Sequence, residues 1–224
     1  QRPQSVVEFK NINNQKSGLN IDKNSCVCDA CNYNETKKKI NWEQREKELV
    51  ELLDKYRKND GSYDCLVPGS GGKDSAYQAH VLKYKYGMNP LTYTWPPIMY
   101  TDYGYENWKN WIELGGFDNV TIKPNGKTMK LLTKLSIENI FHPFQTFFFG
   151  QKNLAPKIAS KFGIELVFFG ENEAEYGNSK KNMSLSHREN KYFSSKNYNN
   201  IYLAGLSLNQ LKVNIPNKLL LVAE

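Results

Sequence analysis

The feature that most constrains the fold of this chain is an alternation between short apolar runs and longer amphipathic segments. The apolar runs have the length and composition of β-strands and cover residues 63–68, 91–95, 119–122 and 165–169. The segments with helical periodicity cover residues 74–86, 104–114, 127–140 and 151–162. Because parallel strands need long crossover connections, this alternation predicts an α/β fold with a parallel sheet of the five-stranded type and helices on both faces.

The sequence divides into two predicted parts. Residues 1–40 are polar and rich in asparagine, so we expect a loop-rich, cysteine-containing appendage there. Residues 41–224 form the α/β domain, which opens with a helix capped by Asn41. The side chains expected on the buried face of this helix are Trp42, Leu49, Leu52, Leu53 and Tyr56. Because the chain begins with Gln and ends in an apolar run, we expect a piece of a longer protein, truncated at its C-terminus.

Small and charged residues cluster in the stretch 66-LVPGSGGKDSAYQAH-80, directly after the first apolar run. A Walker A loop would require Ser or Thr at Asp74 and glycine at Val67, so that pattern fails twice. A dinucleotide fingerprint would require glycine at Asp74 and fails as well. Two common phosphate-binding patterns are thereby excluded.

The core of this stretch, 70-SGGKDS-75, still has the chemistry of an anion cradle. Glycines let backbone N–H groups approach an anion, serine hydroxyls can donate, and the following helix N-terminus adds a favourable dipole. Lys73 adds positive charge, and Asp74 is a candidate ligand for Mg²⁺ between phosphates. The candidate phosphate-binding residues are Ser70, Gly71, Gly72, Lys73, Asp74 and Ser75. Ligands of such sheets bind beyond the carboxyl ends of the strands, where this stretch is expected to lie.

The motif 70-SGGKDS-75 after a strand resembles the pyrophosphate loop of the ATP pyrophosphatases. That superfamily includes NAD synthetase, GMP synthetase and tRNA-thiolating enzymes and has an adenine-nucleotide α-hydrolase fold. Its members cleave ATP between the α and β phosphates, adenylate a substrate oxygen and let a nucleophile displace AMP. The resemblance implies that residues 41–224 are an ATP pyrophosphatase domain using ATP and Mg²⁺, with Lys73 and Asp74 catalytic and Asp74 the magnesium ligand.

A wider resemblance covers residues 44–95, 116-GFDNVTIKPNGK-127 and 170-GENEAEYG-177, which are similar to the N-acetyl sugar amidotransferases. It implies that the acetamido group of a nucleotide-linked or lipid-linked N-acetyl sugar is adenylated and then aminated to an acetamidino group. Such sugars are used in surface polysaccharides, including lipopolysaccharide O-antigen, and in flagellin glycosylation. The implied partner is an ammonia-supplying glutaminase and synthase pair, similar to the subunits of imidazole glycerol phosphate synthase.

The same resemblance implies further site residues. Gly170, Glu171 and Asn172 would line the nucleotide or sugar site, with Glu171 a base or a second magnesium ligand. The fold that the resemblance implies holds adenine by backbone contacts where the loop leaves the second strand, so Thr94 and Trp95 are the candidates for the adenine side. A set of nearby aromatic residues forms either a sugar-stacking surface or part of the core. These residues are Tyr100, Tyr103, Tyr105, Trp108 and Trp111.

Three of the four cysteines, Cys26, Cys28 and Cys31, crowd into 26-CVCDAC-31. The C-x-x-C spacing of Cys28 and Cys31 is that of a zinc half-site, and a tetrahedral site needs two further ligands. In the resembling family a second C-x-x-C stands upstream, which implies Zn²⁺ in the full-length protein. Cys26 is either a ligand of this partial site or incidental. Cys65 lies inside the first apolar run and is expected in the core.

Composition limits the remaining choices. The chain has a formal net charge of +7, 39% hydrophobic residues and no run of about 18 apolar residues, so we expect a soluble, cytoplasmic protein with no membrane span. The positive charge suits a nucleotide, a nucleotide-linked substrate or RNA, although a solvated basic surface explains it equally well. Nucleic acid is the less favoured partner. The alternatives are a tRNA-thiolating enzyme, for which Cys65 is poorly placed as a catalytic thiol, and a non-catalytic ATP-binding protein.

Overall fold

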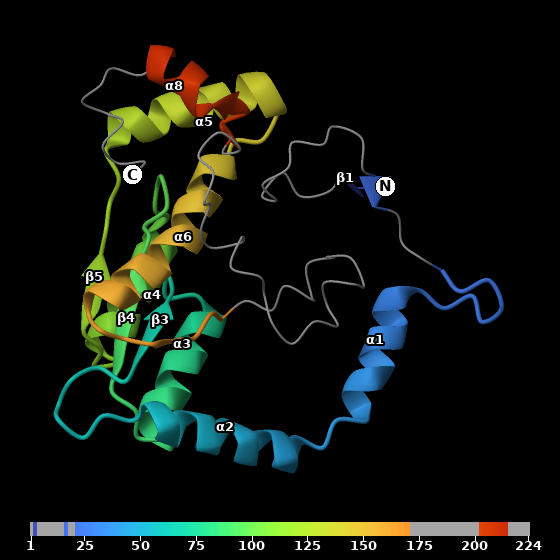
Figure 1. The fold of residues 1–224 in the computed structure, drawn as a ribbon, viewed down its shortest axis with the longest axis vertical. Helices are drawn as coiled ribbons and strands as arrows, with labels where there is room; N and C mark the ends of the chain where they lie inside the picture. Colours follow the sequence, from blue (N-terminus) through green and yellow to red (C-terminus); the bar gives the residue numbers. More distant parts are fainter. Residues whose placement is uncertain (1, 4–15, 18–20, 171–201, 215–224) are drawn as a thin grey trace.

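The centre of the molecule is a parallel β-sheet (Figure 1). The computed structural model describes residues 2–3, 16–17, 21–170 and 202–214. The four strands of the sheet are β3 (Cys65–Pro68), β4 (Pro90–Thr94), β5 (Asn119–Thr121) and β6 (Leu166–Val167). Their order is β5-β4-β3-β6, and every neighbouring pair is parallel. All four strands predicted from the sequence are therefore present, and in the described residues the sheet has four strands rather than five.

Helices cover both faces of this sheet, as the alternation predicted. The helices of the α/β region are α2 (Trp42–Tyr56), α3 (Lys73–His80), α4 (Asp102–Glu113), α5 (Gly126–Ile140) and α6 (Gln145–Lys161). A π-helical turn, η1 (Val81–Lys85), continues α3. Helices α2, α3 and α4 pack on one face, and α6 with the first turn of α5 packs on the other. The architecture is an α/β fold with a parallel sheet between two helical layers.

Side chains of β3 alternate between the two layers, which is why this strand is almost wholly apolar. Cys65 and Val67 contact the cluster that contains Leu53 of α2 and Ala79 of α3. Leu66 points to the opposite layer and packs with Ile158 of α6. A central strand buried on both faces fixes the position of the chain that leaves its carboxyl end.

The strand order places a topological switch point between β3 and β6. From β3 the chain moves outward through β4 to β5 and then returns across the other face to β6, on the far side of β3. The connection that leaves β3 therefore crosses one face of the sheet through α3, whereas the connection that enters β6 crosses the other face through α6, so the two diverge at this point. Such a divergence creates the crevice in which doubly wound sheets bind their ligands.

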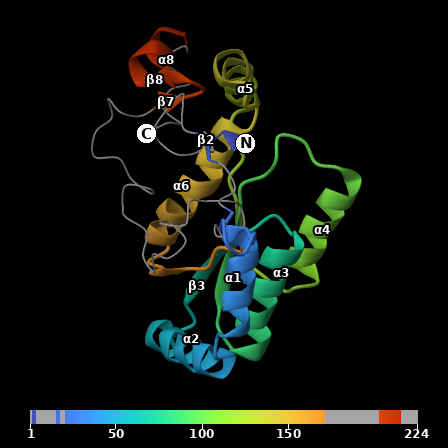
Figure 2. The ribbon, with the colours of Figure 1, turned by 90° about the vertical axis from the view of Figure 1, so that its right-hand side faces the viewer.

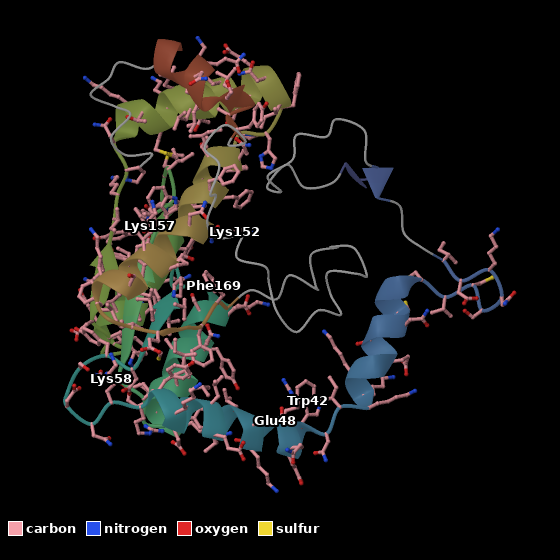
Figure 3. All side chains as sticks on the ribbon, viewed as in Figure 1. Trp42, Glu48, Lys58, Lys152, Lys157 and Phe169 are labelled. Carbon is pink, nitrogen blue, oxygen red and sulfur yellow. The ribbon has the colours of Figure 1, made fainter. Side chains whose placement is uncertain are left out.

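Helix α2 begins as the sequence predicts, because the side chain of Asn41 accepts a hydrogen bond of 3.1 Å from the backbone N–H of Gln44. Its buried face is narrower than expected. Leu53 is fully buried, whereas Trp42 and Leu52 are 64% and 41% exposed. Figure 3 shows that Trp42 lies at the start of α2, beyond the sheet and its helical layers. The prediction that Trp42 and Leu52 pack onto the domain is therefore wrong.

The remaining elements lie outside the sheet. Helix α8 (Leu208–Asn214) and the hairpin of β7 (Tyr202–Leu203) and β8 (Leu206–Ser207) pack on α5, where Leu132, Ala204 and Leu211 form a separate cluster (Figure 2). In the first 40 residues a pair of strands, β1 (Arg2–Pro3) and β2 (Lys16–Ser17), precedes helix α1 (Asp29–Lys38). No helix in the described parts of the chain has the length and hydrophobicity required to cross a membrane.

Candidate functional site

The predicted phosphate loop lies at the switch point. Residues 69–72 leave the carboxyl end of β3, and α3 begins at Lys73. Gly170, just beyond β6, lies against the same helix end, since a Cβ atom added there would be 3.1 Å from the backbone nitrogen of Ser75. The structure thus brings together the loop and the start of 170-GENEAEYG-177, two segments that are far apart in the sequence. Glu171 and Asn172, like residues 178–200, lie outside the described residues.

The N-terminus of α3 has no side-chain cap. Gly72 is the N-cap residue, with extended backbone angles and no side chain that could accept from the first turn. The hydroxyl of Ser75 is buried and donates to the Gly72 carbonyl over 3.1 Å. Neither Gly72 nor Ser75 therefore provides a side-chain acceptor for the first N–H groups of the helix. Unsatisfied N–H groups and the positive end of the helix dipole make this point suitable for a phosphate.

Three polar side chains of the loop are exposed at this helix end: Ser70, Lys73 and Asp74. Among the described residues, Lys73 and Asp74 make no side-chain hydrogen bond and no ion pair, although both occur in the first turn of α3. An ammonium group and a carboxylate at a helix N-terminus fit a phosphate and its Mg²⁺ ion, respectively. Both groups could therefore serve a ligand without breaking contacts that stabilise the fold.

The loop is held against α4 by close backbone contacts. Gly71 has a φ angle of +79°, and a Cβ atom there would lie 2.6 Å from Cα of Trp108 and 2.7 Å from the carbonyl oxygen of Asn107. Gly69 is equally confined, because a Cβ atom would lie 2.7 Å from the indole of Trp111. Gly71 requires glycine for both conformation and space, and Gly69 requires it for space, so the loop has a defined shape before any ligand binds.

The two residues expected on the adenine side are buried. The Thr94 hydroxyl accepts hydrogen bonds of 3.1 Å from both Trp108 Nε1 and Asn119 Nδ2, and its carbonyl accepts from the N–H of Ile122. Trp95 belongs to the core cluster and covers Gly150 of α6. Their side chains support the edge of the sheet from within.

Sequence reasoning missed the role of Asn119 and the hydrogen bond of Trp108. Asn119 donates to both Thr92 and Thr94, and its own carbonyl accepts from the Thr121 hydroxyl over 2.7 Å. This network connects β4, β5 and α4 and holds the helix that contacts Gly71. One signal was available: asparagine is rare within strands, so its presence at the start of a short apolar run indicated a specific hydrogen-bonding role.

The cysteines lie before and at the start of α1. A hydrogen bond with the thiol of Cys28 raises the pKa of the Cys31 thiol, so the two members of the C-x-x-C pair are in contact. Over the parts of the chain that the structure describes, no three His, Cys, Asp or Glu side chains form a group that could hold a metal ion. Cys26, with a φ angle of +55°, therefore does not join the other two in such a group.

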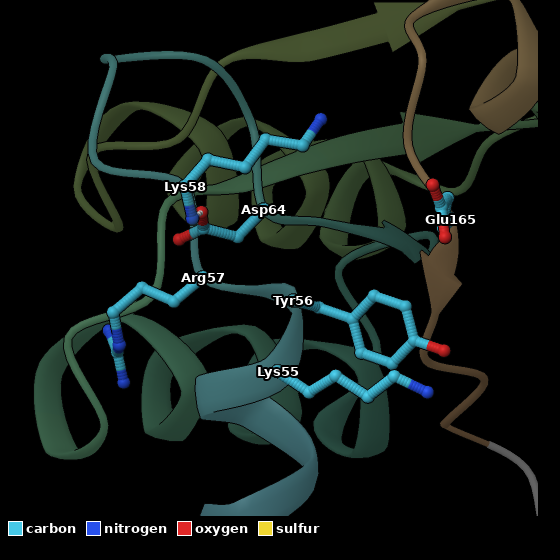
Figure 4. Close-up of a pocket in the computed structure, with 6 residues that line it drawn as sticks. All are labelled: Lys55, Tyr56, Arg57, Lys58, Asp64 and Glu165. Carbon is cyan, nitrogen blue, oxygen red and sulfur yellow. Dashed lines mark hydrogen bonds between the residues drawn. The ribbon is translucent and has the colours of Figure 1, made fainter.

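A separate small cavity of about 190 Å³ lies at the opposite, amino edge of the sheet. Its lining residues are Lys55, Tyr56, Arg57, Lys58, Asp64 and Glu165 (Figure 4). Its volume is below the roughly 300 Å³ at which ligand pockets begin. Its cations also serve the fold: Arg57 donates to the carbonyls of Tyr86 and Gly87, and Lys58 Nζ donates to that of Gly163, each over 2.8 Å. We interpret this cavity as structural.

Asp64 is the central residue of that structural region. Its carboxylate is only 2% exposed and accepts hydrogen bonds from the backbone N–H groups of Lys58 and Asn89. We expect Asp64→Ala to lower the free energy of unfolding by about 2 to 4 kcal/mol, since two enclosed donors lose their acceptor. Chemical denaturation measures this. Asp60→Ala is the matched control, because Asp60 accepts from Ser62 in an exposed turn, and its loss should cost below about 1 kcal/mol. Equal losses in both variants would contradict the interpretation.

Comparison with known proteins gives limited information. No protein-family model matches the chain. An uncharacterized protein of Methanocaldococcus jannaschii is 43% identical over 51 residues. The aligned stretch covers 23% of this chain and 18% of that protein, so the similarity is confined to a short segment of each.

Proposed function

We propose that the chain is an ATP-dependent enzyme that cleaves ATP between the α and β phosphates at the N-terminus of α3. The observation that carries this proposal is the uncapped, glycine-lined start of α3 at the switch point, with exposed Lys73 and Asp74 in its first turn. Backbone N–H groups and Lys73 would bind the leaving pyrophosphate, and Asp74 would hold Mg²⁺. The fold is then of the adenine-nucleotide α-hydrolase type.

The reaction that we propose is the conversion of an acetamido group to an acetamidino group on a nucleotide-linked or lipid-linked N-acetyl sugar. The acetamido oxygen attacks the α-phosphorus of ATP, and pyrophosphate leaves. Ammonia then adds to the activated carbon, and AMP departs with the former amide oxygen. The adenylate is needed because an amide carbonyl is a poor electrophile and its oxygen a poor leaving group.

Support for the sugar substrate comes from sequence resemblance to the N-acetyl sugar amidotransferases. The similar segments include residues 44–95 and 116–127 and the stretch that begins at Gly170. Gly170 contacts the start of α3, so the segment after it begins beside the proposed phosphate site. The reaction requires ammonia, and the partner that we propose as its source is a glutaminase and synthase pair.

One observation disfavours the tRNA-thiolating alternative. Thiolation of this kind needs a reactive cysteine close to the phosphate loop, and Cys65 on β3 is the cysteine nearest to the loop in the sequence. Cys65 is fully buried, and burial raises the pKa of its thiol to about 12. A thiol with so high a pKa is almost wholly protonated at neutral pH and is a weak nucleophile.

We expect the purified protein to form AMP and pyrophosphate when it is incubated with ATP, Mg²⁺, ammonium and UDP-N-acetyl sugars. The sugar product should be about one dalton lighter than the substrate, because an oxygen is replaced by an N–H group. Nucleotide chromatography and mass spectrometry measure the two products.

Three results would contradict parts of this proposal. ADP as the nucleotide product would exclude cleavage between the α and β phosphates. AMP formation that requires tRNA and not sugar would favour the thiolating alternative. Tight ATP binding with no AMP under any condition would favour a non-catalytic ATP-binding protein.

A further inference from the structure

Three aromatic rings form a cluster beside the phosphate loop, which we name the aromatic triad: Tyr100, Tyr105 and Trp108. Tyr100 ends the loop after β4, and the other two residues belong to α4. Their ring centroids are 5.7 to 6.2 Å apart in all three pairs. Trp111, one turn further on, is instead buried in the core, so a ligand could reach the triad but not Trp111.

The triad has a fixed position relative to the phosphate loop. The backbone of Trp108 forms the surface against which Gly71 lies. The indole N–H of Trp108 donates to the buried hydroxyl of Thr94, which holds the ring at the carboxyl edge of β4. A ligand with its phosphates at Gly71 and Gly72 would therefore have the triad directly beside it.

The triad also presents apolar surface to solvent. Tyr105 is 52% exposed, and Tyr100 and Trp108 are half-buried. Ile98 and Met99, in the loop that leads to Tyr100, are exposed as well. Large apolar side chains gathered at the edge of a binding site commonly contact a ligand.

Charge near the triad indicates the kind of ligand. Residues 96–108 contain no lysine or arginine, and Asp102 and Glu106 are exposed acidic residues on α4. The next cation along α4, Lys109, lies 3.7 Å from Glu113. Residues 96–108 thus offer no cation to a phosphate, whereas their carboxylates and tyrosine hydroxyls can bind the hydroxyl groups of a neutral ring.

We propose that the aromatic triad binds the pyranose ring of the N-acetyl sugar, with an apolar ring face on Tyr105. This inference rests on the proposed function and assigns the sugar subsite within it. The interplanar angles of the triad are 36°, 43° and 79°, so no two rings are parallel and the triad cannot clamp a flat base on both sides. The inclined aromatic rings, with tyrosine hydroxyl groups at their edges, suit a pyranose ring, which has an apolar face and hydroxyl groups around its rim.

Binding measurements on Tyr105→Ala test the subsite. Isothermal titration with UDP-N-acetylglucosamine should show affinity weakened by about tenfold, because the stacking surface is lost. Binding of ATP with Mg²⁺ and of UDP alone should stay within about twofold of the unmodified protein, and Tyr105→Phe should keep the sugar affinity within about threefold. Since Tyr105 is half exposed, the melting temperature serves as the check that the fold is retained.

Tyr103→Ala is the matched control, because Tyr103 is 80% exposed on the same helix and makes no ring contact with the triad among the described residues. It should leave sugar binding within about twofold. Equal weakening of UDP binding in Tyr105→Ala would assign the triad to a base, and loss of ATP binding would assign it to adenine; either overturns the subsite. Unchanged sugar binding in Tyr105→Ala, or no binding of this probe by the unmodified protein, also overturns it. The proposed function fails on a different result, the absence of AMP.

Discussion

Replacing Lys73 with methionine is expected to slow AMP formation by about 10²- to 10³-fold. Methionine keeps much of the length of the side chain and removes the ammonium group that would stabilise charge on the departing pyrophosphate. Loss of one preorganised group at a developing negative charge typically has an effect of this size. The melting temperature should be unchanged, because Lys73 is exposed and has no ion pair or side-chain hydrogen bond among the described residues. Nucleotide chromatography at saturating ATP measures the rate.

Two comparisons make the Lys73 experiment specific. Lys73→Arg retains the positive charge and should recover part of the rate, to the extent that a planar guanidinium fits the same position. Lys161→Met removes an exposed lysine from the last turn of α6, away from the loop, and should change the rate by less than about twofold. A Lys73→Met variant as active as Lys161→Met would show that Lys73 has no part in catalysis.

Gly71→Ala is expected to damage both the fold and the site. Alanine at a φ angle of +79° is strained, and its methyl group would meet the backbone of Trp108 and Asn107 at 2.6 to 2.7 Å. Strain and contact together should lower the free energy of unfolding by about 2 to 4 kcal/mol. Because backbone atoms cannot rotate aside, the loop must separate from α4, and ATP affinity should fall at least about tenfold. Chemical denaturation and titration with ATP measure the two effects.

Gly72→Ala provides a matched comparison within the same loop. Gly72 has a φ angle of −68°, and the nearest atom to an added Cβ is Ser70 Oγ at 3.7 Å. Alanine fits there without strain, so the loss of stability should stay below about 1 kcal/mol. If both variants unfolded at the same denaturant concentration, the close contact between Gly71 and α4 would not hold the loop as described.

Much of the fold could be predicted because burial on both faces makes central strands nearly continuous in apolar residues. For this reason residues 63–68 contain β3, and residues 91–95 contain all of β4 except its first residue, Pro90. The start of α6 was harder to predict from the sequence. The helical pattern began at residue 151, whereas the helix begins at Gln145. Residues 145–150 are mostly aromatic and apolar, and Phe144 at the N-cap provides no side-chain hydrogen bond, so neither periodicity nor a capping residue indicated the boundary.

Residues of the candidate site that are close together in the sequence could be predicted from a motif. Whether a side chain is buried could not, because burial depends on how distant segments pack. Gly71, Lys73 and Asp74 lie within four consecutive residues, so a single motif indicated the loop that the structure places at the N-terminus of α3. Thr94 and Trp95 were assigned to the adenine side through their backbone, and the burial of their side chains in the structure was not evident from the sequence. The helices that cover the end of a strand come from other parts of the sequence. A local sequence pattern therefore does not show whether a side chain at the end of a strand is buried.

The strand order also has a consequence for the order in which the site forms during folding. The loop and α3 can form as soon as β3 and β4 pair, which closes a short connection. Gly170 reaches α3 only after β6 has paired with β3, and that pairing closes a much longer loop. Contacts of high sequence separation generally form late, because the entropy of loop closure opposes them. A chain emerging from the ribosome would therefore complete the proposed nucleotide site near the end of folding, and nucleotide binding would then report that the sheet is fully assembled.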